Sequence, residues 1–334
     1  MEQKSVLIGM SGGVDSSVAA ALLKEQGYHV IGATMRLWTY SDSCNMKHEG
    51  CCAESAVEDA RRVCDKLGID FYVMNFKDMF KDKVVDYFVD EYIHGRTPNP
   101  CIACNKYLKF DALLKKALAM GIDYVATGHY AKIEKGEDGK YILRASEAVK
   151  KDQSYVLYNF TQEQLAHTLM PLGGYNKDWV RQKAEELGLG VAHKPDSQEI
   201  CFVEDDDYAK FITDYSGYKP KEGDILDVNG NVIGKHRGLI YYTIGQRKGI
   251  GAYGRPMFVM KIDAENNTIT LGEKGMEFSN ELTAYDVNFV SGEFPKENML
   301  ITAKVRYQAP PAAAMLCPQK DGTVKLMFPE PQRA

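Results

Sequence analysis

A segment rich in glycine and serine near the N-terminus has the composition of a phosphate-binding loop. Residues 11–17 read SGGVDSS and follow a short apolar stretch, residues 5–8, that predicts a buried strand. Adjacent glycines let the backbone approach an anion closely, and the N-terminus of a following helix attracts phosphate. The segment lacks the Gly-Lys-Ser/Thr of a Walker A loop and is not a GxGxxG motif. It therefore predicts a phosphate site of another class; a capped turn between strand and helix is the alternative.

Two cysteine-containing segments could carry thiol chemistry. In residues 96–105, RTPNPCIACN, the prolines predict a stiff loop that excludes helix until about Cys104, which would lie in the first turn of the next helix. A thiol at a helix N-terminus ionises more readily, and Lys106 and Lys109 would help. Cys201 lies in a second segment, PDSQEICF, residues 195–202. Reactive cysteines on two separate loops can run a thiol–disulfide cycle.

A metal site and a buried, inert Cys104 are the alternatives for these cysteines. The spacing of Cys101 and Cys104 is that of half a zinc site, but the chain has no second Cys-x-x-Cys and no His-x3-His. Another group of residues could supply further ligands: Cys44, His48, Cys51 and Cys52. We interpret the acidic run at 204–207 as a solvated loop rather than a metal site.

A long stretch without acidic residues has the composition of an RNA-binding surface. Residues 231–256 read NVIGKHRGLIYYTIGQRKGIGAYGRP, although the whole chain has a net charge of −5. The stretch contains Arg247 and Lys248 among other basic residues, with tyrosines interleaved. Basic and aromatic side chains suit contacts with RNA phosphates and bases. A solvated basic face is the alternative.

The elements that must position these segments alternate between strand and helix in the first half of the chain. We expect strands at 5–8, 29–35, 71–75 and 124–127 and helices at 16–26, 53–67, 79–93 and 105–120. This order predicts an α/β fold with a parallel sheet, whose ligands bind at the carboxyl ends of the strands. The glycine-rich loop, Met35 and Gly128 fall there. After about residue 210, short alternating stretches and turn clusters predict small sheets or a barrel.

Length and composition narrow the class of protein. The 334 residues suffice for two or three domains, and 45% hydrophobic with 26% charged residues is ordinary for a globular protein. No apolar stretch approaches the ~20 residues of a spanning helix, and no secretory signal is recognisable, so we expect no membrane partner. We therefore expect a cytoplasmic protein whose eight cysteines are mostly thiols, ligands or catalysts.

Seven segments in order along the chain resemble the tRNA-specific 2-thiouridylases (MnmA/TrmU family) of the PP-loop ATP pyrophosphatase superfamily. They read GMSGGVDS at 9–16, GRTPNP at 95–100, CN at 104–105, ATGHYA at 126–131, KDQSY at 151–155, DSQEICF at 196–202 and YTIGQRKG at 242–249. The PP-loop is shared with many enzymes, whereas the two cysteine segments and TIGQRKG are far more specific. The change of pattern along the chain predicts domain boundaries near residues 212 and 276. With the resemblance, this gives a PP-loop domain over 1–212, a small β-rich tRNA-binding domain over 213–275 and a β-barrel-like domain over 276–334.

The resemblance also implies a reaction: sulfur replaces the C2 oxygen of the wobble uridine of tRNA, after ATP adenylates that oxygen and releases pyrophosphate. Mg²⁺ would accompany the phosphates, and Asp15 would take part in catalysis. Cys104 would be the nucleophile, and Cys201 would carry a persulfide from a cysteine desulfurase or relay protein. A Cys104–Cys201 disulfide would close the cycle.

The resemblance assigns binding roles to individual residues. ATP would contact Gly9, Met10, Ser11, Gly12, Gly13, Val14, Asp15, Ser16, Met35 and Gly128. The tRNA would contact Asn99, Lys151, Asp152, Gln153, Tyr307 and Gln308, and the basic stretch adds Arg247 and Lys248.

Two departures from the family pattern affect these expectations. Cys101 stands where other members often carry Asp, so a general acid/base role there is in doubt. The family usually continues beyond residue 334 with strands that close its last barrel, so we expect an incomplete C-terminal domain. The alternatives in function are a PP-loop amide-forming ligase, a tRNA thiolase with an iron–sulfur cluster on Cys101, Cys104 and Cys201, and a non-catalytic RNA-binding module.

Overall fold

The fold is described from a computed structural model, which places residues 3–38, 54–196, 200–203 and 206–333. Contacts divide the chain into two units. The first comprises Met1–Val85, Pro100–Asp206 and Asn288–Gly292, and the second comprises Asp86–Asn99, Asp207–Val287 and Glu293–Ala334. The suggested metal ligands Cys44, His48, Cys51 and Cys52 and most of the acidic run lie outside the described residues. None of the described helices is long and apolar enough to cross a membrane.

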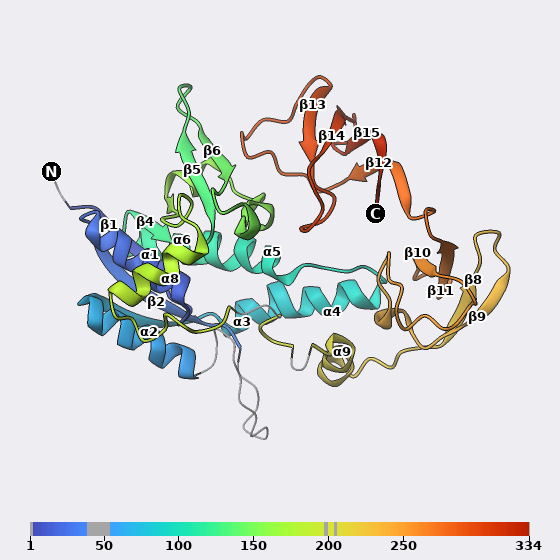
Figure 1. Cartoon of the computed structure of the whole chain (residues 1–334), viewed down its shortest axis with the longest axis horizontal. Helices are drawn as coiled ribbons and strands as arrows, with labels where there is room; N and C mark the ends of the chain where they lie inside the picture. The colour runs from blue at the N-terminus through green and yellow to red at the C-terminus, as the bar shows by residue number, and fades with distance from the viewer. Residues whose placement is uncertain (1–2, 39–53, 197–199, 204–205, 334) are drawn as a thin grey trace. The chain divides into compact units, whose positions relative to one another are not determined.

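The first unit is built on a parallel sheet, as predicted (Figure 1). Its strands are β1 (Ser5–Gly9), β2 (His29–Arg36), β3 (Asp70–Asn75), β4 (Tyr124–Ala126) and β7 (Thr168–Leu169), in the order β3-β2-β1-β4-β7. In the central strand, Leu7 pairs with Ile31 on one side and Val125 on the other. Because β1 has neighbours on both sides and is packed on both faces, its sequence is an unbroken apolar run.

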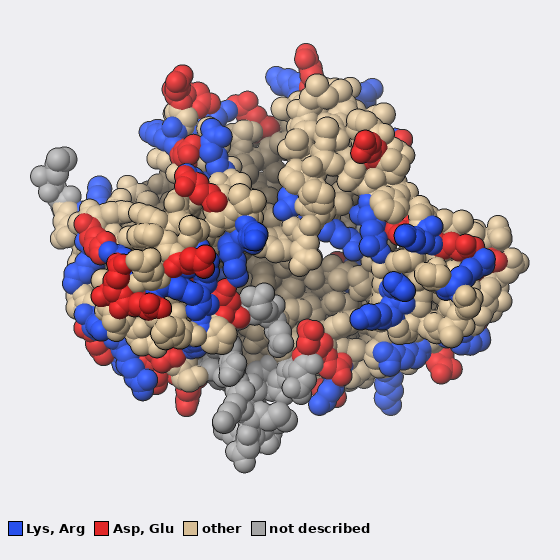
Figure 2. Space-filling view, in the orientation of Figure 1, with Lys and Arg blue, Asp and Glu red and all other residues tan. Residues whose placement is uncertain are grey.

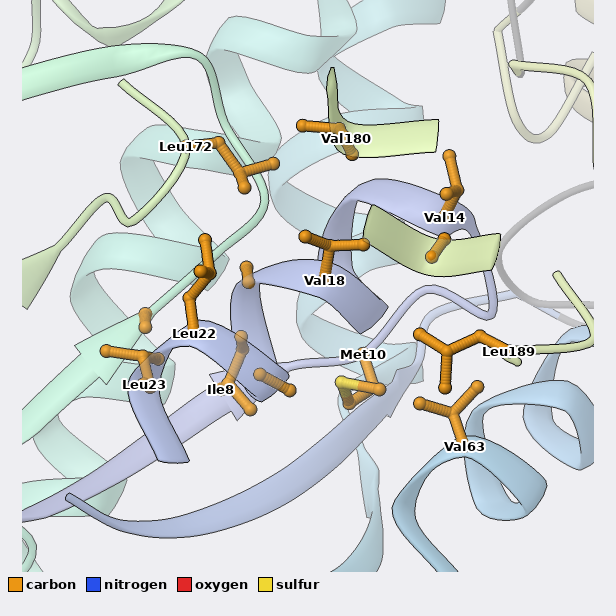
Figure 3. Close-up of a cluster of buried hydrophobic side chains, with 14 of the residues drawn as sticks. Ile8, Met10, Val14, Val18, Leu22, Leu23, Val63, Leu172, Val180 and Leu189 are labelled. Carbon is orange, nitrogen blue, oxygen red and sulfur yellow. The ribbon is translucent and has the colours of Figure 1, made fainter. Parts of the chain in front are cut away.

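Helices α1 (Val14–Glu25), α2 (Glu54–Leu67) and α8 (Lys177–Glu186) bury one apolar cluster against this sheet. Figure 3 shows Ile8 of β1 and Val18 of α1 beside Val180 of α8, all fully buried. The Ala-rich sequence of α1 lets it sit deep in the core, so even Ala19 and Ala20 have no exposed surface. This packing fixes the N-terminus of α1 at the carboxyl end of β1.

A long helical segment begins earlier than the sequence predicted. It runs from α5 (Pro100–Cys104) through a π-helical stretch, η2 (Asn105–Ala112), into α6 (Leu113–Ala119). Proline is favoured at the first position of a helix because its missing N–H has no partner there anyway. The expectation that Pro100 delays the helix until Cys104 is therefore wrong.

Smaller elements complete the first unit. Helix α3 (Lys77–Phe80) leads into the π-helical η1 (Lys81–Val85), and β5 (Ala131–Lys135) pairs with β6 (Tyr141–Ala145) in an antiparallel hairpin. The 3-10 turns η3 (Val149–Lys151) and η4 (Ser154–Leu157) and helix α7 (Gln162–Ala166) follow.

The second unit is mostly β-structure, as predicted. One sheet has the order β10-β11-β8-β9 and the other β12-β15-β14-β13. The first sheet consists of β8 (Gly223–Leu226), β9 (Val232–His236), β10 (Met257–Asp263) and β11 (Thr268–Glu273), with the turn η5 (Leu239–Tyr241) after β9. The second consists of β12 (Phe278–Ala284), β13 (Met299–Ala303), β14 (Ala312–Pro318) and β15 (Val324–Arg333).

Two helices join the β-structure of the second unit. Helix α4 (Asp86–Ile93) packs against α9 (Tyr208–Ser216), with Tyr92 stacked on Tyr208 at a ring distance of 4.8 Å. The Tyr215 hydroxyl donates a 2.5 Å hydrogen bond to Asp86. Helix α4 lies between two parts of the first unit along the chain, and no pattern in the sequence predicts that it packs in the second unit.

We predict that Gly128→Ala disturbs the start of α1. A Cβ at Gly128 would lie 2.7 Å from the backbone nitrogen of Ser16 and 2.8 Å from the carbonyl carbon of Asp15, so the helix start must shift. We expect a loss of about 1–3 kcal/mol in the free energy of unfolding and weaker nucleotide binding, measured by denaturation and calorimetry. Gly174→Ala, where nothing lies within 4 Å, is the control. Equal behaviour of the two variants would contradict the tight approach.

Candidate active site and RNA interface

The glycine-rich loop presents an uncapped helix start. Gly13 is the N-cap of α1, in an extended conformation and without a side-chain cap. The Ser16 and Ser17 hydroxyls instead donate to the carbonyl of Gly13, at 3.2 and 2.8 Å. Gly12 has a positive φ of 69°, and a Cβ there would lie 2.2 Å from the carbonyl oxygen of Ala56. The capped turn is therefore the weaker interpretation, because the first N–H groups of α1 lack a side-chain acceptor and suit an anion.

The residues predicted to bind ATP gather at one edge of the sheet. Gly9 ends β1, and the loop after it leads into α1. Met35 lies near the end of the neighbouring strand β2, and Gly128 follows β4 and touches the start of α1. Met10 is buried, and its carbonyl accepts a 2.8 Å hydrogen bond from Thr34. These placements agree with an ATP site, whose individual contacts stay predictions.

A cluster of charged side chains lies against this loop. Lys177 of α8 is 2.8 Å from both carboxylate oxygens of Asp15 and 2.6 Å from Asp196. Asp196 also pairs with Lys151 at 2.7 Å and more loosely with Arg181 at 3.4 Å. The sequence assigned no role to Lys177 or Arg181, because neither lies in a recognisable motif and their approach to the loop depends on the packing of α8.

Neighbouring groups and burial shift the pKa values of Asp196 and Tyr130 in this cluster. Burial alone would raise the pKa of Asp196, but hydrogen bonds from Lys151 and Lys177 outweigh it and lower the pKa. Tyr130 is buried, and its hydroxyl donates a 2.7 Å hydrogen bond to Asp15. Burial and the nearby Asp15 charge raise the pKa of this phenol, so Tyr130 stays a hydrogen-bond donor at neutral pH.

The structure separates the three candidate cysteines by exposure. Cys101 is exposed in the first turn of α5, whereas Cys104 is one turn further on and only 8% exposed. Cys104 therefore lacks the helix-end position that the sequence predicted for it, and Cys101 has it. Cys201 is exposed, and the next residue, Phe202, is buried against Phe80 at a ring distance of 5.6 Å. The catalytic roles of Cys104 and Cys201 stay predictions.

Cys64 shows what an unreactive thiol looks like in this protein. It is fully buried in the apolar cluster, and burial, with a smaller contribution from Asp65, raises its pKa to about 12. Such a thiol is protonated at neutral pH and does not act as a nucleophile.

A histidine of the ATGHYA segment lies in the first unit beside the end of β4. His129 Nδ1 is 2.7 Å from Thr127 Oγ1, and its ring packs near Phe110 at 5.8 Å. Burial, with the Lys109 charge, lowers the pKa of His129 well below 6.5, so the ring is neutral at pH 7.

In the second unit, the central part of the predicted RNA-binding stretch forms a loop whose conformation is held by internal hydrogen bonds. Gly245 donates to the carbonyl of Val259 at 2.7 Å and has a positive φ of 82°. The Gln246 side chain accepts from the N–H of Thr243 and donates to the carbonyl of Lys248, at 2.9 Å each. These bonds hold the loop so that Arg247 and Lys248 are exposed.

Not all cations of the stretch are available to an RNA. Lys235 pairs with Asp224, Arg255 pairs with Glu273 and Arg237 lies over the ring of Tyr241. Within the described parts of the chain, by contrast, Arg247 and Lys248 have no acidic partner within 4.0 Å. Figure 2 shows blue side chains outnumbering red ones over the sheet that carries β8–β11. The alternative of a solvated basic face therefore accounts well for the cations that are paired. It accounts less well for Arg247 and Lys248.

Two other segments that contain predicted RNA contacts are hydrogen-bonded to the same loop through neighbouring residues. Thr97, two residues before Asn99, donates a 3.2 Å hydrogen bond to Thr243. Arg306, directly before Tyr307 and Gln308, donates to the carbonyl of Ile244 at 3.1 Å. We call this group, Thr97–Asn99, Thr243–Lys248 and Arg306–Gln308, the RNA loop cluster. Sequence motifs far apart along the chain therefore converge in one unit.

The remaining predicted RNA contacts have internal partners in the first unit. Lys151 pairs with Asp196, and the carboxylate of Asp152 accepts hydrogen bonds from Ser146 and Ser154. The side-chain oxygen of Gln153 accepts from the N–H of Tyr130 at 2.9 Å. Their contact with tRNA stays a prediction, and the structure adds a positioning role around Asp196 and Tyr130.

The described residues offer few ligands for a metal ion. Among the residues that the structure describes, no group of three or more His, Cys, Asp and Glu side chains could hold a metal ion. Asp15 is the carboxylate of the glycine-rich loop, and Mg²⁺ commonly binds one protein carboxylate together with substrate phosphates. The loop therefore fits an ion that arrives with ATP.

Profiles of known families match the chain in three consecutive parts. Residues 4–205 match a family described as tRNA methyl transferase HUP domain, and 209–273 match tRNA methyl transferase PRC-barrel domain. Residues 279–334 match an aminomethyltransferase beta-barrel domain.

Two proteins that are similar to this chain over its whole length have the same name. The chain is 58% identical to a tRNA-specific 2-thiouridylase MnmA of Acetivibrio thermocellus, over all of this chain and 94% of that protein. It is 58% identical to the protein of that name from Clostridioides difficile, over 99% of this chain and 92% of that protein. A solved 4-thiouridine synthetase–RNA complex with bound ATP overlaps 57% of this chain and 43% of that chain, at 18% identity and a TM-score of 0.38, which is too low to support an argument.

We predict that removing the two unpaired cations of the loop weakens tRNA binding and flattens its salt dependence. Each lost phosphate contact should reduce the slope of log K against log salt by about 0.7–0.9. The measurement is a salt titration of tRNA binding by Arg247→Ala/Lys248→Ala. Lys235→Ala/Arg255→Ala removes the same charge from acid-paired side chains and is the matched control. Equal slopes for both variants would return the stretch to the solvated-face interpretation.

We predict that His129 makes the protein less stable in acid. Its pKa is lower in the folded state than the ordinary value of 6.5, so below about pH 6.5 the unfolded chain binds more protons. The free energy of unfolding should fall there by up to about 1.4 kcal/mol per pH unit and be unaffected above it. Denaturant titrations from pH 5 to 8 should show a weaker pH dependence for His129→Gln than for His193→Gln, an exposed control. Identical pH profiles would contradict the prediction.

Proposed function

The chain belongs to the family of tRNA-specific 2-thiouridylases, and we propose that it replaces the C2 oxygen of the wobble uridine of tRNA by sulfur, using ATP. The identity of 58% along the whole chain carries this proposal, and the glycine-rich loop and the two cysteine segments agree with it. The family descriptions mention methyl transfer, but the cysteine pair and the uncapped loop suit thiolation after adenylation.

The first step activates the uridine. The C2 oxygen attacks the α-phosphorus of ATP, the bond to pyrophosphate breaks, and a good leaving group, AMP, is attached to C2. The N–H groups at the start of α1 would hold phosphate oxygens, and Tyr130 and Lys177 would keep Asp15 in place. Mg²⁺, bound by Asp15 and the phosphates, would offset negative charge.

The second step delivers sulfur. The terminal sulfur of a persulfide on Cys201 attacks C2, the C2–O bond breaks, and AMP leaves. The Cys104 thiolate then attacks the sulfur of Cys201, which leaves sulfur on C2 and both cysteines as a disulfide. A thiol reductant restores the two thiols. The exposure of Cys201 suits loading by a persulfide donor protein, and the low exposure of Cys104 limits its reaction with other thiols and oxidants in solution.

Recognition of tRNA falls to the RNA loop cluster. Arg247 and Lys248 would contact phosphates, and the half-exposed ring of Tyr307 offers a face for stacking. The target uridine must leave the base stack of the anticodon loop to reach the cysteines.

We predict that the products distinguish this function from its alternatives. ATP should yield AMP and pyrophosphate only with tRNA, and nucleoside mass spectrometry should find 2-thiouridine after addition of a sulfur source. ADP as product would contradict adenylation. Thiolation should be lost in Cys104→Ser and in Cys201→Ser, because each removes one half of the disulfide.

Cys101→Ser and a control complete this test. Cys101→Ser should retain activity, reduced by about 10²–10⁴-fold if Cys101 transfers a proton. Cys317→Ser, in β14 of the second unit, should match the unaltered protein. Bound iron together with an inactive Cys101→Ser would instead support an iron–sulfur thiolase, and full activity of Cys104→Ser would support an amide-forming ligase.

A further inference from the structure

One ammonium group connects the adenylation loop with the persulfide segment. Lys177 Nζ lies 2.8 Å from Asp15 in the loop and 2.6 Å from Asp196 in the cysteine segment. The Lys177 side chain is only 12% exposed, so solvent screens these ion pairs less than it screens a surface pair. No other described cation pairs with both carboxylates.

Described residues before and after Cys201 in the chain are held by close contacts, with residues 197–199 outside the described part of the chain. Five residues before it, Asp196 is held by Lys177, Lys151 and Arg181. Directly after it, Phe202 is 1% exposed and packs against Phe80. The contact of Phe202 with Phe80 is apolar, so a nearby charge does not weaken it. The ion pairs of Asp196, by contrast, change when an anion binds Lys177.

We propose that Lys177 is a positioning residue that couples nucleotide binding at the glycine-rich loop to the placement of Cys201. This inference rests on the proposed function. Phosphate oxygens at the start of α1 lie next to Asp15 and compete for the same ammonium. When they draw Lys177 toward the nucleotide, Asp196 keeps Lys151 and Arg181 but loses its nearest partner, and this change at Asp196 alters the placement of Cys201 five residues later.

Removal of Lys177 should uncouple the two steps rather than slow them equally. Asp15 and Asp196 both lie within hydrogen-bond distance of one nitrogen, so their charges repel each other once that nitrogen is gone. Adenylation loses one of the two contacts that hold Asp15 but retains Tyr130 and the backbone of the loop, whereas delivery of sulfur loses the link to Cys201 and is slowed more. Activated tRNA would then lose AMP to water before sulfur arrives.

The test uses Lys177→Met, with Lys177→Arg as the conservative variant. The first readout is the AMP formed per 2-thiouridine, which we expect to rise at least five-fold in Lys177→Met and to be largely restored in Lys177→Arg. The second is the alkylation rate of Cys201 by iodoacetamide, followed by peptide mass spectrometry, with and without a non-hydrolysable ATP analogue. The analogue should change this rate at least three-fold in the unaltered protein and less than 1.5-fold in Lys177→Met.

Two further variants keep the test decisive. Lys183→Met removes a lysine from the same helix that pairs with Glu25 at 2.9 Å, and it should behave as the unaltered protein. Asp196→Asn breaks the Lys177–Asp196 ion pair from its other end with little change in side-chain volume, so it replaces Lys177→Met if that variant folds poorly. The double variant should show the same AMP-to-thiouridine ratio and alkylation response as either single variant.

The outcomes separate this inference from the proposed function. An unchanged AMP-to-thiouridine ratio with an intact alkylation response in Lys177→Met would overturn the coupling role. Failure of the unaltered protein to form 2-thiouridine would overturn the proposed function, while the alkylation comparison, which needs no turnover, still tests Lys177.

Discussion

The close approach of three backbone segments at the glycine-rich loop is the constraint on which the catalytic unit depends. Gly12 lies against the backbone of α2, and Gly128 lies against the first turn of α1. Neither position has room for a Cβ, so the ends of β1 and β4 can meet α1 only with glycine there. This contact leaves the first N–H groups of α1 uncapped and places Asp15 within reach of Tyr130 and Lys177.

The proposed RNA contacts and the proposed nucleophile, Cys104, are close together along the chain. The segment Asp86–Asn99 packs in the second unit, and the chain returns to the first unit at Pro100. Thr97 is hydrogen-bonded to the loop that carries Arg247, and Cys104 lies seven residues further on, in the helix that Pro100 begins. A short stretch containing Pro98 and Pro100 therefore joins the proposed RNA contacts to α5 along the chain.

The sequence predicted what depends on local pattern and missed what depends on packing. Strand–helix alternation gave the parallel sheet, and alternating apolar residues gave the β-structure of the second unit. The start of α5 was placed too late, because the exclusion of helix before proline was weighed above the preference of proline for the first helical position. Lys177 and Arg181 were missed because their spacing on α8 is that of an ordinary amphipathic helix, and only the packing of α8 on α1 brings them to the loop.

The cations of this chain, whose net charge is −5, differ between the two proposed anion sites in whether they are paired with carboxylates. Near the glycine-rich loop, Lys151, Lys177 and Lys194 are already paired with carboxylates. Because the carboxylates neutralise their charge, these lysines attract a distant polyanion only weakly. Screening over about 8 Å at physiological ionic strength weakens the attraction further. In the RNA loop cluster, Arg247 and Lys248 are exposed without an acidic partner in the described chain. The exposed cations of the second unit therefore suit a first contact with a polyanion, whereas the paired cations of the first unit must exchange a carboxylate partner to bind an anion.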